Sequence, residues 1–236
     1  MKTISWCGYE WITQERWGQV HPEKPHWWYD ESCVLVDENN YLHLKTKNNP
    51  KYFPEIDHTS MIGVGLVSCT KEFGFGTYSV VAKLPKGKNL WPAFWMWSWD
   101  SWPPEIDVFE AYSNSNGSYI KPRLMNPLGF WNVQTNVHYE DLKHDRMIGG
   151  KTHFFGFKDP SKNFINYTLV WQKNYIKLYY DNKLVRTVTD PDILSQLSEK
   201  KMNVIINNGV TADVNTTDPP QSDFIIKNFR YSPVCY

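Results

Sequence analysis

The chain has 236 residues, and its 25 lysines and arginines are balanced by 25 aspartates and glutamates, so the formal net charge is zero. A general nucleic-acid binder needs a basic field to neutralise phosphates, and a protein held on anionic lipid needs a basic surface. No apolar run approaches the roughly 20 residues that cross a bilayer. We therefore expect neither a nucleic-acid nor a membrane partner, and the length suits one domain over residues 1–236.

Short strand-like runs separated by turn residues follow one another along the chain. The expected strands are residues 32–36, 41–46, 63–69, 76–84, 93–97, 105–111, 133–139, 165–172, 175–180, 183–189, 202–207 and 223–231. Asp181-Asn182-Lys183 predicts a hairpin turn, and the only good helical stretch is 192–199. Many short strands with almost no helix predict an all-β sandwich or barrel, and two large antiparallel sheets suit this length.

Aromatic residues are unusually abundant, with 12 Trp, 14 Tyr and 12 Phe making up 16% of the chain. Most of them are expected in the core. Trp is costly to bury completely, however, because its indole N–H needs a hydrogen-bond partner. The surplus is therefore expected half-exposed in a cleft, where a flat indole face can stack on a sugar ring.

The cysteines and the N-terminus leave several alternatives open. Cys7, Cys33, Cys69 and Cys235 show no Cys-x-x-Cys spacing, which argues against a zinc site. A Cys7–Cys235 disulfide and free buried thiols both remain open. The first residues lack the continuous apolar segment of a signal peptide, so the chain is expected to be either retained in the cell or a mature secreted form.

A strand-forming run carries three acids, Glu105, Asp107 and Glu110. Alternation puts Glu105 and Asp107 on one face, whereas a regular strand would point Glu110 into the core, where a charge is costly. One extra residue, a β-bulge at Val108 or Phe109, would bring all three acids to one face.

That arrangement has a chemical use, because retaining glycosidases need two carboxyl groups about 5–5.5 Å apart. Neighbouring same-face positions on a bulged strand can supply such a gap. The middle acid, Asp107, would then share or hold a proton beside Glu105. On the acid pattern alone, an edge strand with three solvated acids and a calcium site remain alternatives.

The flanking sequence carries a resemblance to a known family. The motifs are Phe73-Gly74-Phe75-Gly76-Thr77-Tyr78, Lys83-Leu84-Pro85-Lys86-Gly87, Leu90-Trp91-Pro92-Ala93-Phe94-Trp95-Met96 and the Glu105–Glu110 string. In this order and at this spacing, residues 73–112 resemble glycoside hydrolase family 16, the laminarinase, agarase and carrageenase group, in its bulged subgroup. Weaker echoes cover most of the chain, including Trp17-Gly18 and Leu42-His43-Leu44, which look like the family's opening strands. The resemblance implies one catalytic domain, a β-jelly-roll sandwich whose concave sheet forms an open cleft.

The resemblance also implies roles for the residues that match the family's motif. Glu105 matches the nucleophile, Asp107 the assisting acid and Glu110 the acid/base. His138 matches a histidine that often faces the cleft in bulged members, with a core or surface histidine as the alternative. Trp95 matches a tryptophan that packs against sugar near the cleavage point.

Further substrate-binding residues are expected around these acids. Trp91, Trp95 and Trp99 share one face of a regular strand, although Trp91 could instead be core. Trp99 and Trp102 lie in the loop before the acids and are expected at the rim of the cleft. Asn207 stands where family members often have Asn before a Gly-Gly stretch, and is also expected to bind substrate.

These features predict an endo-acting retaining hydrolase of a β-1,3- or mixed-linkage β-glucan, working as a monomer on a polysaccharide. Val64-Gly65-Leu66 replaces the family's usual Ser-Gly-Arg stretch, which puts the β-1,3 preference in question. The alternatives are a hydrolase of a marine galactan such as agar, porphyran or carrageenan, a non-catalytic carbohydrate-binding jelly roll, and a capsid or tail module. In the galactan case Lys121 and Arg123 could face sulfate. No cofactor or metal is expected, although a structural calcium, which some family members hold, is left open.

Overall fold

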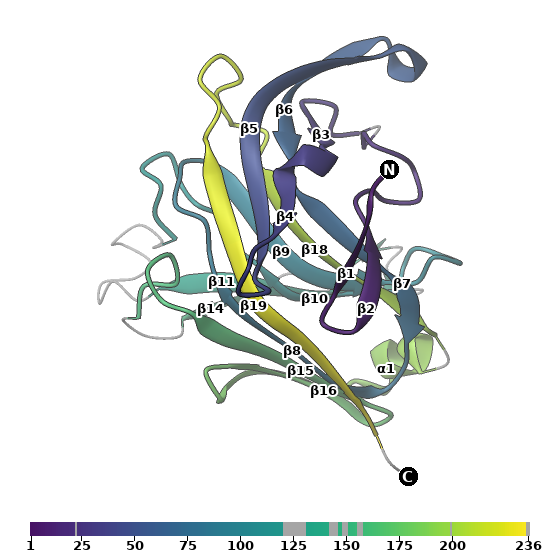
Figure 1. The fold of residues 1–236 in the computed structure, drawn as a ribbon. Coiled ribbons are helices and arrows are strands. Elements are labelled where there is room, and N and C mark those ends of the chain that lie inside the picture. The colour runs from purple at the N-terminus through teal and green to yellow at the C-terminus, as the bar shows by residue number, and fades with distance from the viewer. Residues whose placement is uncertain are drawn as a thin grey trace.

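The computed structural model describes residues 1–21, 23–119, 131–141, 146–147, 151–154, 158–198 and 200–234. Two large β-sheets pack against each other, and they confirm the predicted all-β sandwich (Figure 1). The helical segments are short: η1 (Glu31–Cys33), η2 (Pro54–Ile56) and α1 (Pro191–Leu197). Within the described ranges, no helix is long and apolar enough to span a bilayer.

The first sheet, called the cleft sheet below, has eight antiparallel strands. Their order is β1 (Thr3–Trp6), β2 (Tyr9–Ile12), β7 (Leu66–Phe73), β18 (Met202–Val210), β9 (Leu90–Trp97), β10 (Glu105–Glu110), β11 (Asn132–His138) and β14 (Lys151–Phe154). Strands distant in sequence, such as β9 and β18, are therefore neighbours at the centre of this sheet.

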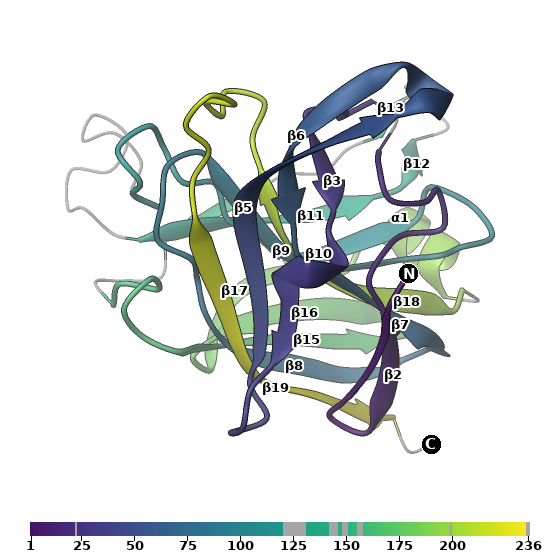
Figure 2. The same cartoon turned by 45° about the horizontal axis from the view of Figure 1, so that its top comes forward.

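The second sheet, called the outer sheet, has nine strands. Their order is β17 (Lys183–Val188), β16 (Tyr175–Tyr180), β15 (Ile165–Gln172), β8 (Gly76–Lys83), β19 (Ser222–Pro233), β5 (Leu42–Phe53), β6 (His58–Val64) and β3 (Trp27–Tyr29), with β4 (Val34–Val36) also pairing with β5. A small separate ribbon joins β12 (Glu140–Asp141) and β13 (Arg146–Met147). β5 and β6 project beyond the rest of their sheet as a long hairpin (Figure 2).

The core lies between the two sheets and follows from the period-2 pattern of the strands. Phe94 and Met96 of β9 point inward and are fully buried, and they join Tyr78 and Leu169 of the outer sheet in one cluster. Each such side chain contributes about 1.5–3 kcal/mol on burial. The other face of β9 is consequently left free to line a cleft.

The prediction of one continuous strand over residues 63–69 is wrong. Residues 63–69 form the end of β6 and the start of β7, and the chain passes from the outer sheet to the cleft sheet between them. Gly65 lies at the crossing, where an added Cβ would meet the Cys33 carbonyl oxygen at 2.7 Å and Leu44 Cα at 2.9 Å. Only glycine permits so close a backbone approach.

The turns show both a success and a miss. Asp181 and Asn182 have φ values of 45° and 65°, which confirms the predicted hairpin and matches a type I′ turn. Trp17 and Gly18, which looked like an opening strand, lie instead in a tight turn closed by the Gly18 N–H donating to the Glu15 carbonyl (3.0 Å). The actual opening hairpin, β1–β2, was not predicted.

Among the described cysteines, Cys7, Cys33 and Cys69 are free thiols, and the last two are buried. Cys235, the proposed partner in the Cys7–Cys235 alternative, lies outside the described residues, as do Lys121 and Arg123.

Candidate active site

A cleft of 710 Å³ opens on the face of the cleft sheet that points away from the core. Side chains of β9, β10, β11 and β18 form its floor, and residues between Arg16 and Tyr29 form a wall. The predicted site residues that line it are Trp91, Trp95, Trp102, Glu105, Asp107, Glu110, His138 and Asn207. The structure thus brings together residues that span more than a hundred positions in the chain.

The strand that carries the acids has the predicted bulge. Asp107 pairs with Trp95 and Phe109 with Phe94, so Val108 is the extra residue relative to β9. Val108 and Phe109 consequently both face the core, where each is fully buried. The phase is reset after them, and Glu105, Asp107 and Glu110 all line the cleft.

Glu105 is the first residue of β10 and pairs with His138 of β11. The Trp102 indole N–H donates to Glu105 Oε2 (2.7 Å), and His138 Nε2 lies 3.7 Å from Glu105 Oε1. Burial, followed by the nearby Asp107 charge, raises the pKa of Glu105 well above its usual value. Trp102 and His138 act in the opposite direction, because each stabilises the carboxylate.

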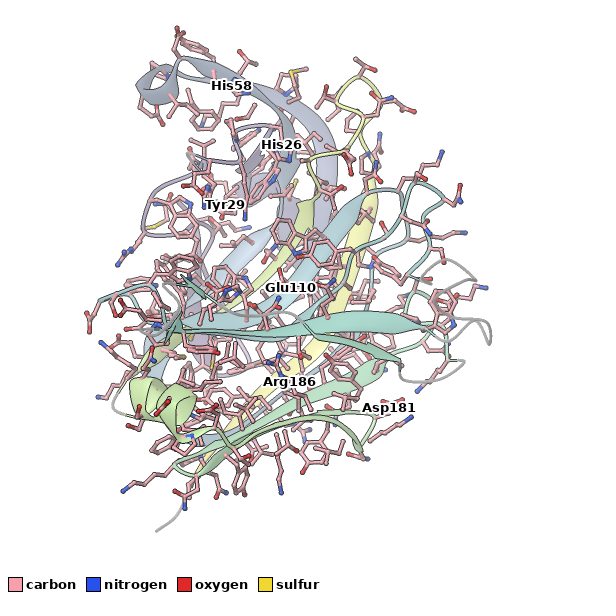
Figure 3. The ribbon with its side chains drawn as sticks, turned by 180° about the vertical axis from the view of Figure 1, so that it is seen from behind. His26, Tyr29, His58, Glu110, Asp181 and Arg186 are labelled. Atoms are coloured by element: carbon pink, nitrogen blue, oxygen red, sulfur yellow. The ribbon has the colours of Figure 1, made fainter. Side chains whose placement is uncertain are left out.

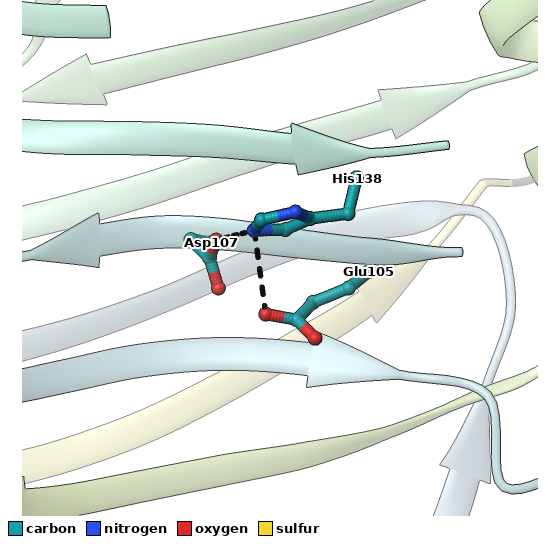
Figure 4. Close-up of side chains that lie close together, drawn as sticks. All are labelled: Glu105, Asp107 and His138. Carbon is teal, nitrogen blue, oxygen red and sulfur yellow. Dashed lines mark ion pairs between the residues drawn. The ribbon is translucent and has the colours of Figure 1, made fainter. Parts of the chain in front are cut away.

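Asp107 is the most enclosed of the three acids, with only 2% of its surface exposed. Its Oδ2 lies 3.2 Å from His138 Nε2, as the dashed lines of Figure 4 show. Burial, and after it the Glu110 charge, raises the pKa of Asp107 well above the usual range. Two adjacent buried carboxyls with raised pKa values tend to retain a proton between them.

Glu110 is 8% exposed and is held by three donors. The Trp91 indole (2.9 Å) and the Tyr112 hydroxyl (2.8 Å) donate to its Oε1, while the Asn136 amide donates to its Oε2. Tyr112 also stacks on Trp91 at 5.3 Å between ring centroids. The Glu110 carboxyl is therefore fixed in one orientation at the cleft floor.

The other predicted binding residues differ in their placement. The Trp95 indole N–H donates to Asn207 Oδ1 (2.8 Å), which couples β9 to β18 at the floor. Trp102 stands at the rim with 46% of its surface exposed. Trp99 does not line the cleft; it packs against a separate cluster of buried residues that includes Trp97.

The wall formed by the N-terminal segment was not foreseen. The Arg16 guanidinium lies 4.6 Å from the centroid of the Trp97 ring, and the Lys24 ammonium lies 4.4 Å from that of Trp91. These cation–π contacts cover part of the indole surface. They also make Trp91 chiefly a neighbour of Glu110 rather than an open platform.

A buried acid, Glu15, lies behind this wall. It has no exposed surface, and its polar neighbours include the Ser68 hydroxyl and the Trp97 indole. Burial raises its pKa to about 8, and the charge of Glu105 adds to this effect. Neither carboxyl oxygen completes a close hydrogen bond within the described residues, so a charge on Glu15 is poorly compensated.

Support for the bulge comes from the outer sheet. The Tyr180 hydroxyl of β16 donates to the carbonyl oxygen of Val108 (2.8 Å), the extra residue of the bulge. Arg186 of β17 donates to the carbonyl (2.9 Å) and hydroxyl (3.0 Å) oxygens of Thr135 on β11. In Figure 3, Glu110 and Arg186 lie on either side of β11. Hydrogen bonds from the outer sheet therefore hold the two strands that form this part of the cleft floor.

Tyr180→Phe is expected to destabilise the fold by about 1–3 kcal/mol, because the Val108 carbonyl would be buried without a donor. Urea unfolding of the variant and of the wild type checks this. Tyr167→Phe is the matched control, since the Tyr167 hydroxyl is buried without a hydrogen-bond partner in the described structure. An equal loss in both variants would contradict the role of Tyr180.

Several functional residues escaped the sequence reasoning although a signal existed for two of them. Asn136 precedes His138 by two positions, and Tyr112 follows Glu110 by two, so alternation places each on the cleft face. Glu15 and Tyr180 gave no such signal, because their partners come from other strands or the other sheet.

Comparison with known proteins defines the class. The sequence model of "Glycosyl hydrolases family 16" matches residues 22–225. The chain therefore belongs to glycoside hydrolase family 16, and the resemblance found in the sequence is confirmed.

Individual relatives are more distant. The chain is 27% identical to "Glucan endo-1,3-beta-glucosidase A1" of Niallia circulans over 79% of this chain and 27% of that protein. It is 28% identical to "Beta-1,3-glucan-binding protein" of Penaeus monodon over 50% of this chain and 32% of that protein. The chain thus spans about a third or less of these relatives. The solved endo-beta-1,3-glucanase from Pyrococcus furiosus has the same fold, with a TM-score of 0.71, 21% identity and 98% coverage of both chains.

Proposed function

We propose that this protein is an endo-acting, retaining glycoside hydrolase that cleaves internal linkages of a β-1,3- or mixed-linkage β-glucan. The observation that carries the proposal is the bulged strand, which places Glu105, Asp107 and Glu110 side by side on the floor of an open cleft. Internal cleavage is proposed because the enzymes from Niallia circulans and Pyrococcus furiosus compared above both carry names that describe endo-acting enzymes.

Glu105 is proposed as the nucleophile and Glu110 as the acid/base. Glu110 donates a proton to the glycosidic oxygen while Glu105 attacks the anomeric carbon and forms a glycosyl-enzyme. Glu110 then removes a proton from water, which attacks the same carbon and releases Glu105. Two inversions at one carbon give net retention.

The neighbours of the acids favour this division of roles. Glu105 needs to be ionised for attack, and the Trp102 indole N–H donates to its carboxylate. Asp107 is buried more deeply than Glu105, so it is the better place for the retained proton. A protonated Asp107 beside Glu105 would also orient the nucleophile and ease its departure in the second step.

The substrate class rests on the relatives. The names of all three proteins compared above refer to β-1,3-glucan. The cleft itself offers indole and amide groups suited to a neutral sugar, with Trp95 bonded to Asn207 and Trp102 exposed at the rim. We therefore place β-glucan ahead of a sulfated galactan.

The test is reducing-end release from laminarin, lichenan, agarose, porphyran and carrageenans. Activity on the glucans is expected, with lost activity in Glu105→Gln, since a neutral amide cannot form the glycosyl-enzyme. Proton NMR of the first product should show the β-anomer. Glu72→Gln, an exposed acid on β7 of the same sheet, is the matched control and should retain full activity.

Each alternative has its own outcome. Cleavage of a galactan in place of the glucans would overturn the substrate assignment but keep the mechanism. Binding of laminarin without any cleavage would favour the non-catalytic module. An α-anomer as first product would exclude retention.

A further inference from the structure

Three ligand atoms converge beside the nucleophile. Glu105, Asp107 and His138 each offer one potential ligand atom, and these three atoms lie within 4.8 Å of one another. The histidine nitrogen is 3.2 Å from the aspartate oxygen and 3.7 Å from the glutamate oxygen. Figure 4 shows the imidazole above the two carboxylates, with its Nε2 directed at both.

These separations match the spacing of ligands around a small metal ion. Bonds of about 2.0–2.1 Å in a tetrahedral site put neighbouring ligand atoms roughly 3.3 Å apart. The distances from His138 Nε2 to Asp107 Oδ2 (3.2 Å) and to Glu105 Oε1 (3.7 Å) lie on either side of that value, so little movement of these side chains is needed. Both carboxylates come from alternate positions of β10, and the histidine comes from its pairing partner β11.

A second, independent observation points to a ligand at the same place. Asp107 Oδ2 is buried, and the residue is only 2% exposed. His138 Nε2 lies 3.2 Å from this oxygen, but within the described part of the chain no group donates to it with the geometry of a hydrogen bond. A buried carboxylate oxygen without a donor is costly. A cation bound between this atom and His138 would supply the missing partner.

The surrounding groups already orient the three ligands. The Trp102 indole donates to Glu105 Oε2, which leaves Oε1 directed toward His138. The Trp102 ring also lies 5.9 Å from that of His138, at 40°. The fourth position opens to the cleft, where water or a sugar hydroxyl can complete the shell, as in zinc sites with three protein ligands.

We propose that Glu105, Asp107 and His138 form a binding site for a transition-metal dication of the Zn²⁺ class, and that bound metal blocks the hydrolase. Metal binding displaces the proton retained on Asp107, and two carboxylates and a neutral imidazole then balance the charge of such an ion. An imidazole ligand and only three protein ligands favour Zn²⁺ over Mg²⁺ or Ca²⁺, which take six or more oxygens. Metal binding stands on geometry alone, whereas the inhibition rests on the proposed function of Glu105.

The binding test is isothermal titration of ZnCl₂ into chelator-treated full-length protein. One site is expected in wild type, and His138→Gln or Asp107→Asn should weaken it by at least about 100-fold, since each removes a direct ligand. Circular dichroism checks that both variants are folded. MgCl₂ and CaCl₂ at the same concentration should give no saturable heat.

His43→Gln is the matched control. His43 also lies between two carboxylates, with Nδ1 2.9 Å from Asp223 Oδ2 and Nε2 3.3 Å from Asp37 Oδ2. These acids face opposite ring nitrogens, so they cannot meet on one ion, and this variant should bind Zn²⁺ like wild type. Loss of the site in His43→Gln, or its persistence in His138→Gln, would overturn the proposal.

Inhibition is tested on whichever polymer the enzyme cleaves. Zn²⁺ at ten times its Kd should raise the apparent KM about elevenfold, because metal and substrate compete for Glu105, and EDTA should reverse the effect. Saturable Zn²⁺ binding by a protein that cleaves nothing would support the metal site and count against the hydrolase. Cleavage without Zn²⁺ binding would remove the metal site and leave the hydrolase intact.

Discussion

Glu110→Gln is expected to slow cleavage of an unactivated β-glucan by roughly 10²–10⁴-fold, the usual contribution of a positioned general acid. Gln keeps the shape of Glu110, and its carbonyl oxygen can still accept from Trp91 and Tyr112. Its amide would then face Asn136, whose own amide can turn to present an oxygen. We therefore expect unfolding free energy within about 1 kcal/mol of wild type.

A small nucleophile distinguishes the acid/base from the nucleophile. In Glu110→Ala, azide added with an aryl β-glucoside should attack the glycosyl-enzyme and expel Glu105, which gives a β-glycosyl azide. An activated aryl leaving group needs no acid, so the first step still proceeds. In Glu105→Ala the same anion should instead give the α-azide, because only one inversion takes place. NMR of the azide product decides between the two.

Tyr112→Phe is the control for this prediction. It removes one of the three donors to Glu110 and leaves the carboxyl in place, so turnover should fall less than about tenfold. Comparable losses in Tyr112→Phe and Glu110→Gln would mean that the Glu110 carboxyl transfers no proton.

The sequence predicted the part of the site that lies within one short stretch of the chain. Glu105, Asp107 and Glu110 lie within six positions of one strand, and the cost of burying Glu110 was enough to predict the bulge. The bulge appears in the pairing of β10 with both of its neighbours, β9 and β11. Alternation likewise separated cleft-facing Trp95 from core-facing Phe94. Local periodicity and the price of a buried charge decide such features without tertiary information.

The rest depends on contacts between distant strands. Nothing near Tyr180 signals that its hydroxyl reaches the Val108 carbonyl in the opposite sheet. The segment that carries Arg16 and Lys24 has no regular periodicity, yet it lies over Trp97 and Trp91 because β2 joins the same sheet as β9. Trp99 was predicted from its neighbours in sequence, but it leaves the cleft because β9 ends at Trp97.

Glu15→Gln is expected to make the protein more stable at alkaline pH. Burial raises the folded-state pKa of Glu15 to about 8, from the ordinary value of 4.5 for an exposed carboxyl. Between these values the folded chain holds a proton that the unfolded chain has lost, so wild-type stability falls as pH rises. The slope is about 1.4 kcal/mol per pH unit, and the loss is on the order of 5 kcal/mol by pH 9. Glutamine does not titrate, so the Glu15→Gln variant does not lose this stability.

The difference between the two proteins isolates this residue from the other acids. Glu105 and Asp107 also have raised pKa values, so the free energy of unfolding of both proteins falls with rising pH for this reason too. Urea unfolding at several pH values should therefore show Glu15→Gln gaining on wild type from about pH 4.5 to about pH 8 and no further above that. Glu10→Gln, on the exposed side of β2, should track wild type throughout. A gap between Glu15→Gln and wild type that stays constant with pH would mean that Glu15 is already ionised in the folded protein. Its neighbours Ser68 and Trp97 would then have to stabilise a charge that their placement leaves without a close hydrogen bond.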